Sequence, residues 1–97
     1  MKSKIKTEVH THTSVSPHAY STVHEMVQQA QNLGISLLAI TNHGPATPDG
    51  AHPWHFANLC CVPRKIGDVY VLRGAEANLI NYNGTVDIPE HVLRRLD

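Results

Sequence analysis

The sequence predicts an α/β protein in which strands and helices alternate along the chain. Short apolar segments recur at strand spacing, and segments with helical spacing and capping signals lie between them. The order strand, helix, strand, short helix, strand implies parallel pairing with right-handed crossovers. At 97 residues the chain forms at most one small domain.

The first predicted strand runs from Ile5 to His10, where apolar and polar residues alternate. A polar loop follows, and Thr22 and Glu25 then stand at the spacing of a capping box, which marks the start of a helix. Gly34 is a natural stop for this helix. The apolar face of the helix is formed, at helical spacing, by Val23, Met26, Val27, Ala30 and Leu33.

The next predicted strand runs from Ile35 to Thr41, because a nearly continuous apolar run is typical of a strand covered on both faces. A short helix is expected from Trp54 to Cys61, ended by Pro63. A third strand is predicted from Val69 to Leu72. Three parallel strands cannot close a barrel, which takes about 250 residues, so the chain is expected to be part of one.

The last segments predict a hairpin and a helix. Leu79 to Tyr82 and Thr85 to Ile88 form the two strands of the hairpin, and the intervening Asn83-Gly84 pair favours a type I′ turn. Pro89 suits the first turn of a helix that is expected to continue from Glu90 to Leu96.

Composition excludes several functions. Eight basic residues balance eight acidic ones, so neither a nucleic-acid surface nor a membrane-attracted face is expected. No apolar run approaches the roughly 20 residues that span a bilayer, and no apolar signal core precedes the first strand, so the cytoplasm is the expected location. Cys60 and Cys61 are adjacent, cannot form a disulfide framework, and are expected to be buried thiols.

Histidine is the unusual component of the chain, with eight in 97 residues. Packing does not require so many imidazoles, whereas metal binding or acid–base chemistry does. In parallel α/β proteins, sites form at the carboxyl ends of the strands, where the loops converge. Five candidate metal ligands lie at or near the predicted strand ends: His10, His12, His18, His43 and Glu76.

The H-x-H spacing of His10 and His12 is suited to binding one ion, because residues i and i+2 of an extended segment project to the same side. Glu76, from another strand, could bridge two ions through its two oxygens. Imidazole and carboxylate together suit zinc, manganese or iron, and the residues alone do not choose between them. A surface pair of histidines would need no metal, so the prediction depends on the convergence of several ligands.

Three further residues are weaker candidates for substrate binding. His52 and His55 flank Trp54 and could line the substrate entrance, the alternative being two solvated loop histidines. Arg73 could meet a phosphate group, the alternative being a salt bridge. Trp54 and Phe56 are expected to be packing residues.

Five segments surround these residues: E-V-H-T-H-T, H-A-Y-S-T, I-T-N-H-G-P, W-H-F and L-R-G-A-E-A-N. In order and in spacing they resemble the first motifs of the PHP (polymerase and histidinol phosphatase) family. The resemblance extends from Glu8 to about Leu96 and is closest to the stand-alone bacterial phosphatases of the family. It implies that residues 1–97 form a partial PHP domain, the N-terminal portion of a distorted seven-stranded (βα) TIM-like barrel.

The resemblance also implies a metal-dependent phosphatase. Up to three ions, commonly zinc, would hydrolyse a small phosphorylated substrate by activating water. By resemblance, His10 and His12 would bind one ion, and Glu76 would bridge it to a second. His18 and His43 would bind the third.

Two positions depart from the family pattern, since Glu8 and Asn42 stand where the family usually has Asp. A carboxylate beside a ligand histidine orients its ring better than a neutral amide does. We therefore expect weaker support for His43, and stronger metal binding there in an Asn42→Asp variant.

The chain stops at Asp97, before the next strand of the family and the ligands that this strand would bring. Little phosphatase activity is therefore expected of these residues alone, and an unpaired sheet edge beside the third strand is expected to favour self-association. Two alternatives remain open: a non-catalytic metal-binding remnant, and a module attached to a DNA polymerase. The balanced charge and the lack of polymerase sequence count against the second.

Overall fold

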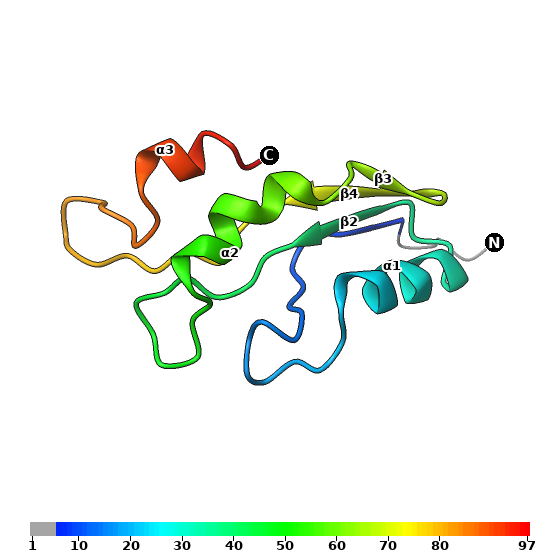
Figure 1. Ribbon diagram of the computed structural model, residues 1–97, viewed down its shortest axis with the longest axis horizontal. Helices are drawn as coiled ribbons and strands as arrows, with labels where there is room; N and C mark the ends of the chain where they lie inside the picture. The colour runs from blue at the N-terminus through cyan, green and yellow to red at the C-terminus, as the bar shows by residue number, and fades with distance from the viewer. Residues whose placement is uncertain (1–5) are drawn as a thin grey trace.

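A four-stranded open sheet with the strand order β1-β2-β4-β3 forms the centre of the molecule (Figure 1). The computed structural model describes residues 6–97, so Ile5, in the first predicted strand, lies outside the described residues. The strands β1 (Thr7–Glu8), β2 (Leu37–Ile40) and β4 (Val69–Arg73) are parallel, as the alternation of strands and helices predicted. This arrangement confirms the mixed α/β class.

A short strand that was not expected from the sequence, β3 (Lys65–Ile66), pairs antiparallel with β4. The two strands are joined by Gly67-Asp68, and Gly67 has a φ of 59°. A Gly-Asp pair between apolar residues is a recognised hairpin signal, and it could have been used to find this strand.

The outer edge of β4 is covered, so the expectation of an unpaired edge beside this strand is wrong. Next to the β3 pairing, the backbone N–H of Val71 donates to Arg64 O at 2.8 Å. At the end of the strand, Asp97 N donates to Arg73 O at 2.8 Å. Among the described residues, β1 and the two-residue β3 are the edge strands of the sheet.

Helix α1 (Val23–Asn32) begins with the predicted capping box. Thr22 Oγ1 accepts from Glu25 N at 3.2 Å, and the Glu25 carboxylate accepts from Thr22 N at 3.0 Å. These bonds satisfy backbone donors that a helix start leaves without partners. Gly34, with a φ of 75°, follows the end of the helix as predicted.

The two later helices are short. Helix α2 (Pro53–Asn58) continues into a 3₁₀ turn, η1 (Leu59–Cys61), and together they confirm the predicted short helix. Helix α3 (Glu90–Leu93) ends before Leu96, the expected limit. Within residues 6–97, no helix combines the length and the apolar character needed to cross a membrane.

The segment between β4 and α3 contains less regular pairing than the predicted hairpin. A single antiparallel bridge joins Leu79 to Val86. The turn is not type I′, because that type needs a positive φ at both central residues, and Gly84 has one while Asn83 does not. The side chain of Asn81 shapes the turn instead, since its Oδ1 accepts from Asn83 N at 2.9 Å.

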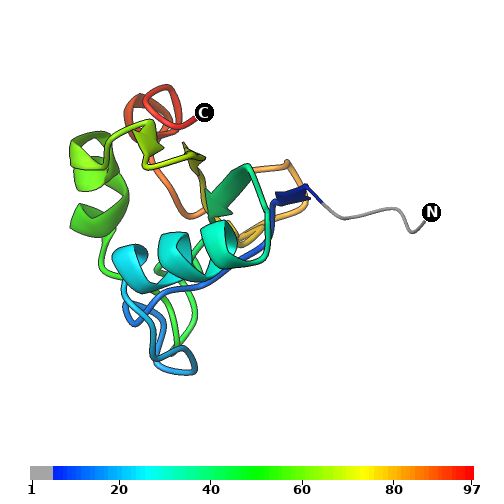
Figure 2. The same ribbon diagram turned by 90° about the vertical axis from the view of Figure 1, so that its right-hand side faces the viewer.

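The main core lies on the face of the sheet that α1 and α2 cover, and Figure 2 shows both helices on the same side of the strands. On the other face, Leu93 and Leu96 share a pocket with Ala39 of β2 and with Leu72 of β4. β2 is therefore covered on both faces, as its apolar run predicted. The buried core includes Leu38, Ile40, Val69 and Val71 from the sheet, Val27 and Ala30 from α1, and Phe56 and Leu59 from α2 and η1.

Two expectations about packing are wrong. Cys60 and Cys61 are exposed free thiols, because the buried position of η1 is occupied by Leu59. Trp54 is 78% exposed at the start of α2, whereas Phe56, two residues later, is only 1% exposed and is the packing residue of that helix.

Candidate metal centre

Two of the predicted ligands, His10 and His12, meet at one carboxylate oxygen of a third, Glu76. The Nε2 atom of His10 is in direct contact with Glu76 Oε1, and His12 Nε2 lies 3.5 Å from the same oxygen. One ligand atom from each residue lies within 4.8 Å of the others. The imidazole rings of His10 and His12 meet edge to face, with centroids 5.1 Å apart and an interplanar angle of 85°. This geometry allows two imidazoles and a carboxylate to share one cation.

Thr11 fixes the backbone between His10 and His12 through hydrogen bonds to β2 and the residue that follows it. Its hydroxyl donates to Ala39 O at 2.5 Å, and its backbone N–H donates to Thr41 Oγ1 at 3.0 Å. The buried threonine thereby ties the segment that follows β1 to strand β2. Its two neighbours, His10 and His12, consequently project to the same side, as the spacing predicted.

His43 approaches the other oxygen of the same carboxylate. His43 Nδ1 lies 2.9 Å from Glu76 Oε2, and the two residues form an isolated parallel bridge. The ring of His43 stacks on that of His12, with centroids 4.4 Å apart and an interplanar angle of 16°. Glu76 thus has one oxygen toward His10 and His12 and the other toward His43.

The chemistry of the donors fits a metal, because two imidazoles and a carboxylate form a donor set that zinc accepts. The nitrogen of His12 that lies beside Glu76 is Nε2. The opposite nitrogen, Nδ1, is the single buried side-chain nitrogen or oxygen without a hydrogen-bond partner among residues 6–97, and an ion at Nε2 would leave it in that state.

His18 lies apart from the atoms that meet at Glu76. It is exposed in the loop between β1 and α1, and it does not belong to the group whose ligand atoms lie within 4.8 Å of one another. Its assignment as a ligand stays a prediction.

Asn42 organises the loop that carries His18, and it is completely buried. Its Oδ1 accepts from Thr13 N and from Ser16 Oγ, both at 2.8 Å. Because a backbone N–H can only donate, this bond fixes the amide orientation, and Nδ2 then donates to Thr13 Oγ1 at 2.9 Å. The expectation that residue 42 orients the ring of His43 is therefore wrong, since the carboxylate beside that ring is Glu76.

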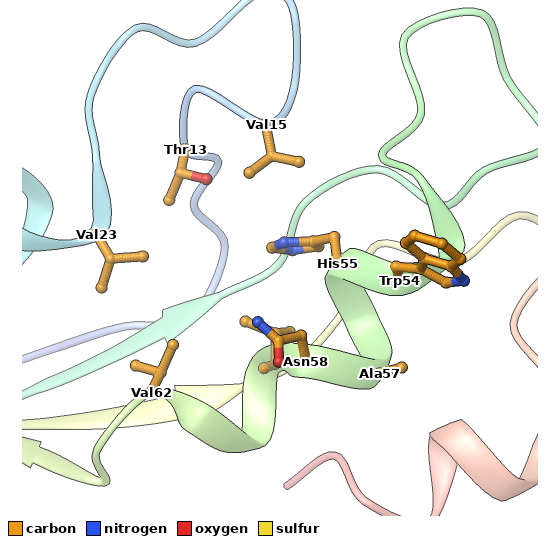
Figure 3. Close-up of a pocket in the computed structure, with 9 residues that line it drawn as sticks. Thr13, Val15, Val23, Trp54, His55, Ala57, Asn58 and Val62 are labelled. Atoms are coloured by element: carbon orange, nitrogen blue, oxygen red, sulfur yellow. The ribbon is translucent and has the colours of Figure 1, made fainter.

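The amide of Asn42 also contacts His55, with 3.2 Å between Asn42 Nδ2 and His55 Nε2. Burial lowers the pKa of His55, which favours the neutral ring that can accept from the amide. Figure 3 shows the His55 ring between α2 and the loop that carries Thr13 and Val15. There it lines a largely apolar pocket of about 650 Å³. Substrate binding by His55 stays a prediction.

The other two weak candidates have structural partners. His52 caps α2, because its Nδ1 accepts from Trp54 N at 3.0 Å. The side chain of Arg73 is 9% exposed and forms a salt bridge to Asp97, with 3.2 Å between Nε and Oδ2. The salt bridge was the alternative left open for Arg73. Arg73 also donates to Cys60 O at 3.3 Å.

Asp49 is a neighbour of the site that was not identified from the sequence. Its Oδ2 lies 3.8 Å from His43 Nε2. A hydrogen bond from the Thr47 side chain lowers the pKa of Asp49, and the nearby imidazoles of His43 and His18 lower it further. The Asp49-Gly50 pair signals a turn, but only the path of the folded loop brings the carboxylate to His43.

The fold and the convergent ligands define a candidate metal-binding α/β domain, with its site beyond the carboxyl ends of parallel strands. The chain belongs to the PHP domain family, whose model matches residues 8–94. The resemblance found in the motifs is thereby confirmed.

Several relatives of this chain bear the name probable phosphatase. One from Clostridium acetobutylicum is 51% identical over 90 residues, which cover 93% of this chain and 37% of the relative. One from Caldicellulosiruptor saccharolyticus is 50% identical over 93 residues, covering 96% and 39% respectively. One from Proteus mirabilis is 49% identical over 90 residues, covering 93% and 37%. The chain therefore spans less than two fifths of the length of these relatives.

Proposed function

We propose that this chain forms part of a metal-dependent phosphoesterase that hydrolyses phosphate monoesters. The observation that carries the proposal is the convergence of three imidazoles on the two oxygens of Glu76. The PHP domain family and the relatives named probable phosphatases support the reaction class.

The residues of the chain would supply a fixed and accessible set of donors. The side chain of His10 is 64% exposed and that of His12 26% exposed, so a phosphate group could approach from the side of His10. Thr11 sets the positions of both histidines through its bonds to β2. A divalent ion held by these donors would polarise the phosphate ester and lower the pKa of a bound water toward neutrality.

We extend the proposal to a centre of up to three ions in a complete domain, with this sheet as the first part of a seven-stranded barrel. Zinc is the preferred metal because the donors are imidazoles and carboxylates, and manganese and iron are the alternatives. His18 would join His43 at an ion beyond the one that His10 and His12 hold.

The substrate would be a small phosphorylated molecule. The balanced charge gives no support to a nucleic-acid partner, and the names of the relatives favour a phosphatase over a polymerase-associated module. A metal-binding remnant without activity is the alternative that an assay must exclude. The cytoplasmic location stays a prediction.

A chimera tests this function. The chain would be assayed with a chromogenic phosphate ester and added zinc or manganese, alone and joined to the C-terminal remainder of the Clostridium acetobutylicum relative. We expect the chain alone to be slower by orders of magnitude, because an under-coordinated ion is neither retained nor positioned for attack. The chimera should turn over substrate, and His10→Ala should abolish that turnover. A folded, metal-loaded chimera that is inert beside an active parent would refute the proposal.

A further inference from the structure

The loop from His43 to Ala51 closes on itself. Ala51 N donates to His43 O at 2.9 Å, and Gly50 N donates to Thr47 O at 2.9 Å. A Cβ atom on Gly50 would overlap the carbonyl oxygen of Gly44, so this closure requires glycine at position 50. The closed loop returns Asp49 to the imidazole from which the loop starts.

A second set of bonds holds the loop from outside. Asp87 Oδ2 accepts from Ala46 N at 2.9 Å and from Asn78 Nδ2 at 2.7 Å. The same Asn78 amide donates to Gly44 O at 3.3 Å. The position of Asp49 is consequently built into the fold and is not a chance approach of a free loop.

The two nitrogens of His43 have different surroundings. Nδ1 lies 2.9 Å from Glu76 Oε2, which is hydrogen-bond distance, and Nε2 lies 3.8 Å from Asp49 Oδ2. When Nδ1–H donates to Glu76, Nε2 carries the lone pair that binds metals.

The gap between Nε2 and Asp49 is too long for a hydrogen bond. It is close to the roughly 3.4 Å that separates two donors, each about 2.1 Å from a tetrahedral zinc ion. Imidazole and carboxylate are both donors of zinc sites.

We infer that Asp49 is a metal ligand, sharing with His43 Nε2 a divalent cation separate from the one at His10 and His12. The inference rests on the proposed function, because it takes His43 as a ligand. It adds an anionic donor that comes from this chain's own loop. The competing explanation is an ion pair between Asp49 and a protonated His43.

A zinc titration followed by NMR of the histidine side-chain nitrogens tests the inference on the 97-residue chain. In the wild type, His43 Nε2 should move to its metal-bound shift as zinc is added. In Asp49→Asn the same change should need at least about tenfold more zinc, while the shifts of His10 and His12 keep their zinc dependence. Asp68→Asn is the matched control, since Asp68 is an exposed carboxylate before the amino end of β4.

Asp49→His separates ligation from ion pairing. A histidine can bind the metal and cannot neutralise a protonated His43, so this variant should retain zinc at His43. It also keeps the inference testable should Asp49→Asn not fold. Equal zinc affinity of His43 in wild type and Asp49→Asn, or loss of zinc in Asp49→His, would overturn the inference. Zinc at His43 without zinc at His10 and His12 would instead count against the proposed function alone.

Discussion

His43 and Glu76 face each other as a parallel β-bridge just beyond the last regular pairs of β2 and β4, with Nδ1 and Oε2 2.9 Å apart. The backbone continues the sheet through this bridge, because Gly44 N donates to Glu76 O at 2.9 Å. The distance between imidazole and carboxylate is therefore set by two neighbouring strands. A site built on rigid elements holds its ligands more accurately than one built on loops alone.

Metal should bind through His10, His12 and Glu76. Elemental analysis of protein purified without a histidine tag should find a divalent metal in the wild type and much less in a His10→Ala, His12→Ala double variant. The His24→Ala, His91→Ala double variant is the control, since both of these histidines are exposed on helices. Unchanged metal content in the His10→Ala, His12→Ala variant would contradict the assignment of these histidines as metal ligands.

Asn42 should stabilise the loop that carries His18. Asn42→Leu leaves Thr13 N and Ser16 Oγ without their shared acceptor, so the free energy of unfolding should fall by about 1–3 kcal/mol for each orphaned group. Urea denaturation measures this change. A variant as stable as the wild type would show that the loop does not depend on the amide.

Asn42→Asp should act mainly on His55. A carboxylate at 3.2 Å from Nε2 favours the imidazolium, so the pKa of His55, which burial lowers in the wild type, should rise. An NMR titration of the His55 ring checks this outcome. An unchanged pKa would mean that the side chain of residue 42 has turned away from His55.

The pairing of Asp97 with Arg73 should make stability depend on acid. A hydrogen bond from the Arg73 side chain is the main reason that the pKa of Asp97 is lowered to about 2. Because an unfolded Asp titrates near pH ~3.9, this stabilisation is complete above that pH and is lost as the pH falls through about 2.

Asp97→Asn should therefore cost up to about 2 kcal/mol at pH ~7 and almost nothing below pH ~2, as measured by urea denaturation. Glu90→Gln is the control, because its pair with Arg94 is exposed and such pairs contribute less than about 1 kcal/mol. The same loss at both pH values would contradict the pairing.

The chain should self-associate through β1, one of the two edge strands of the sheet in the described part of the chain. Val9, which follows β1, is 60% exposed, and a lysine there should repel a second copy. Light scattering should show larger particles for the wild type than for Val9→Lys. A monodisperse wild-type monomer at high concentration would contradict this expectation.

Local patterns in the sequence were sufficient for the elements whose causes are local. The Thr22–Glu25 capping box and the helical spacing of α1 depend on residues within two turns, and the apolar run of β2 reflects burial on both faces. The prediction of a type I′ turn at Asn83-Gly84 was wrong, because the side chain of Asn81 accepts from Asn83 N and shapes the turn instead. Strand β3 is only two residues long, too short for periodicity to show it.

The sequence by itself determined which residues could be ligands, because H-x-H spacing and strand-end positions are properties of the chain alone. Only the tertiary structure decided which nitrogen faces which oxygen. Asn42, adjacent to His43, turns away to Thr13 and Ser16, whereas Asp49, six positions after His43, returns to it. The physical reason is that hydrogen bonds between segments far apart in the chain, such as Ala46 N to Asp87 and Gly44 N to Glu76, set these distances.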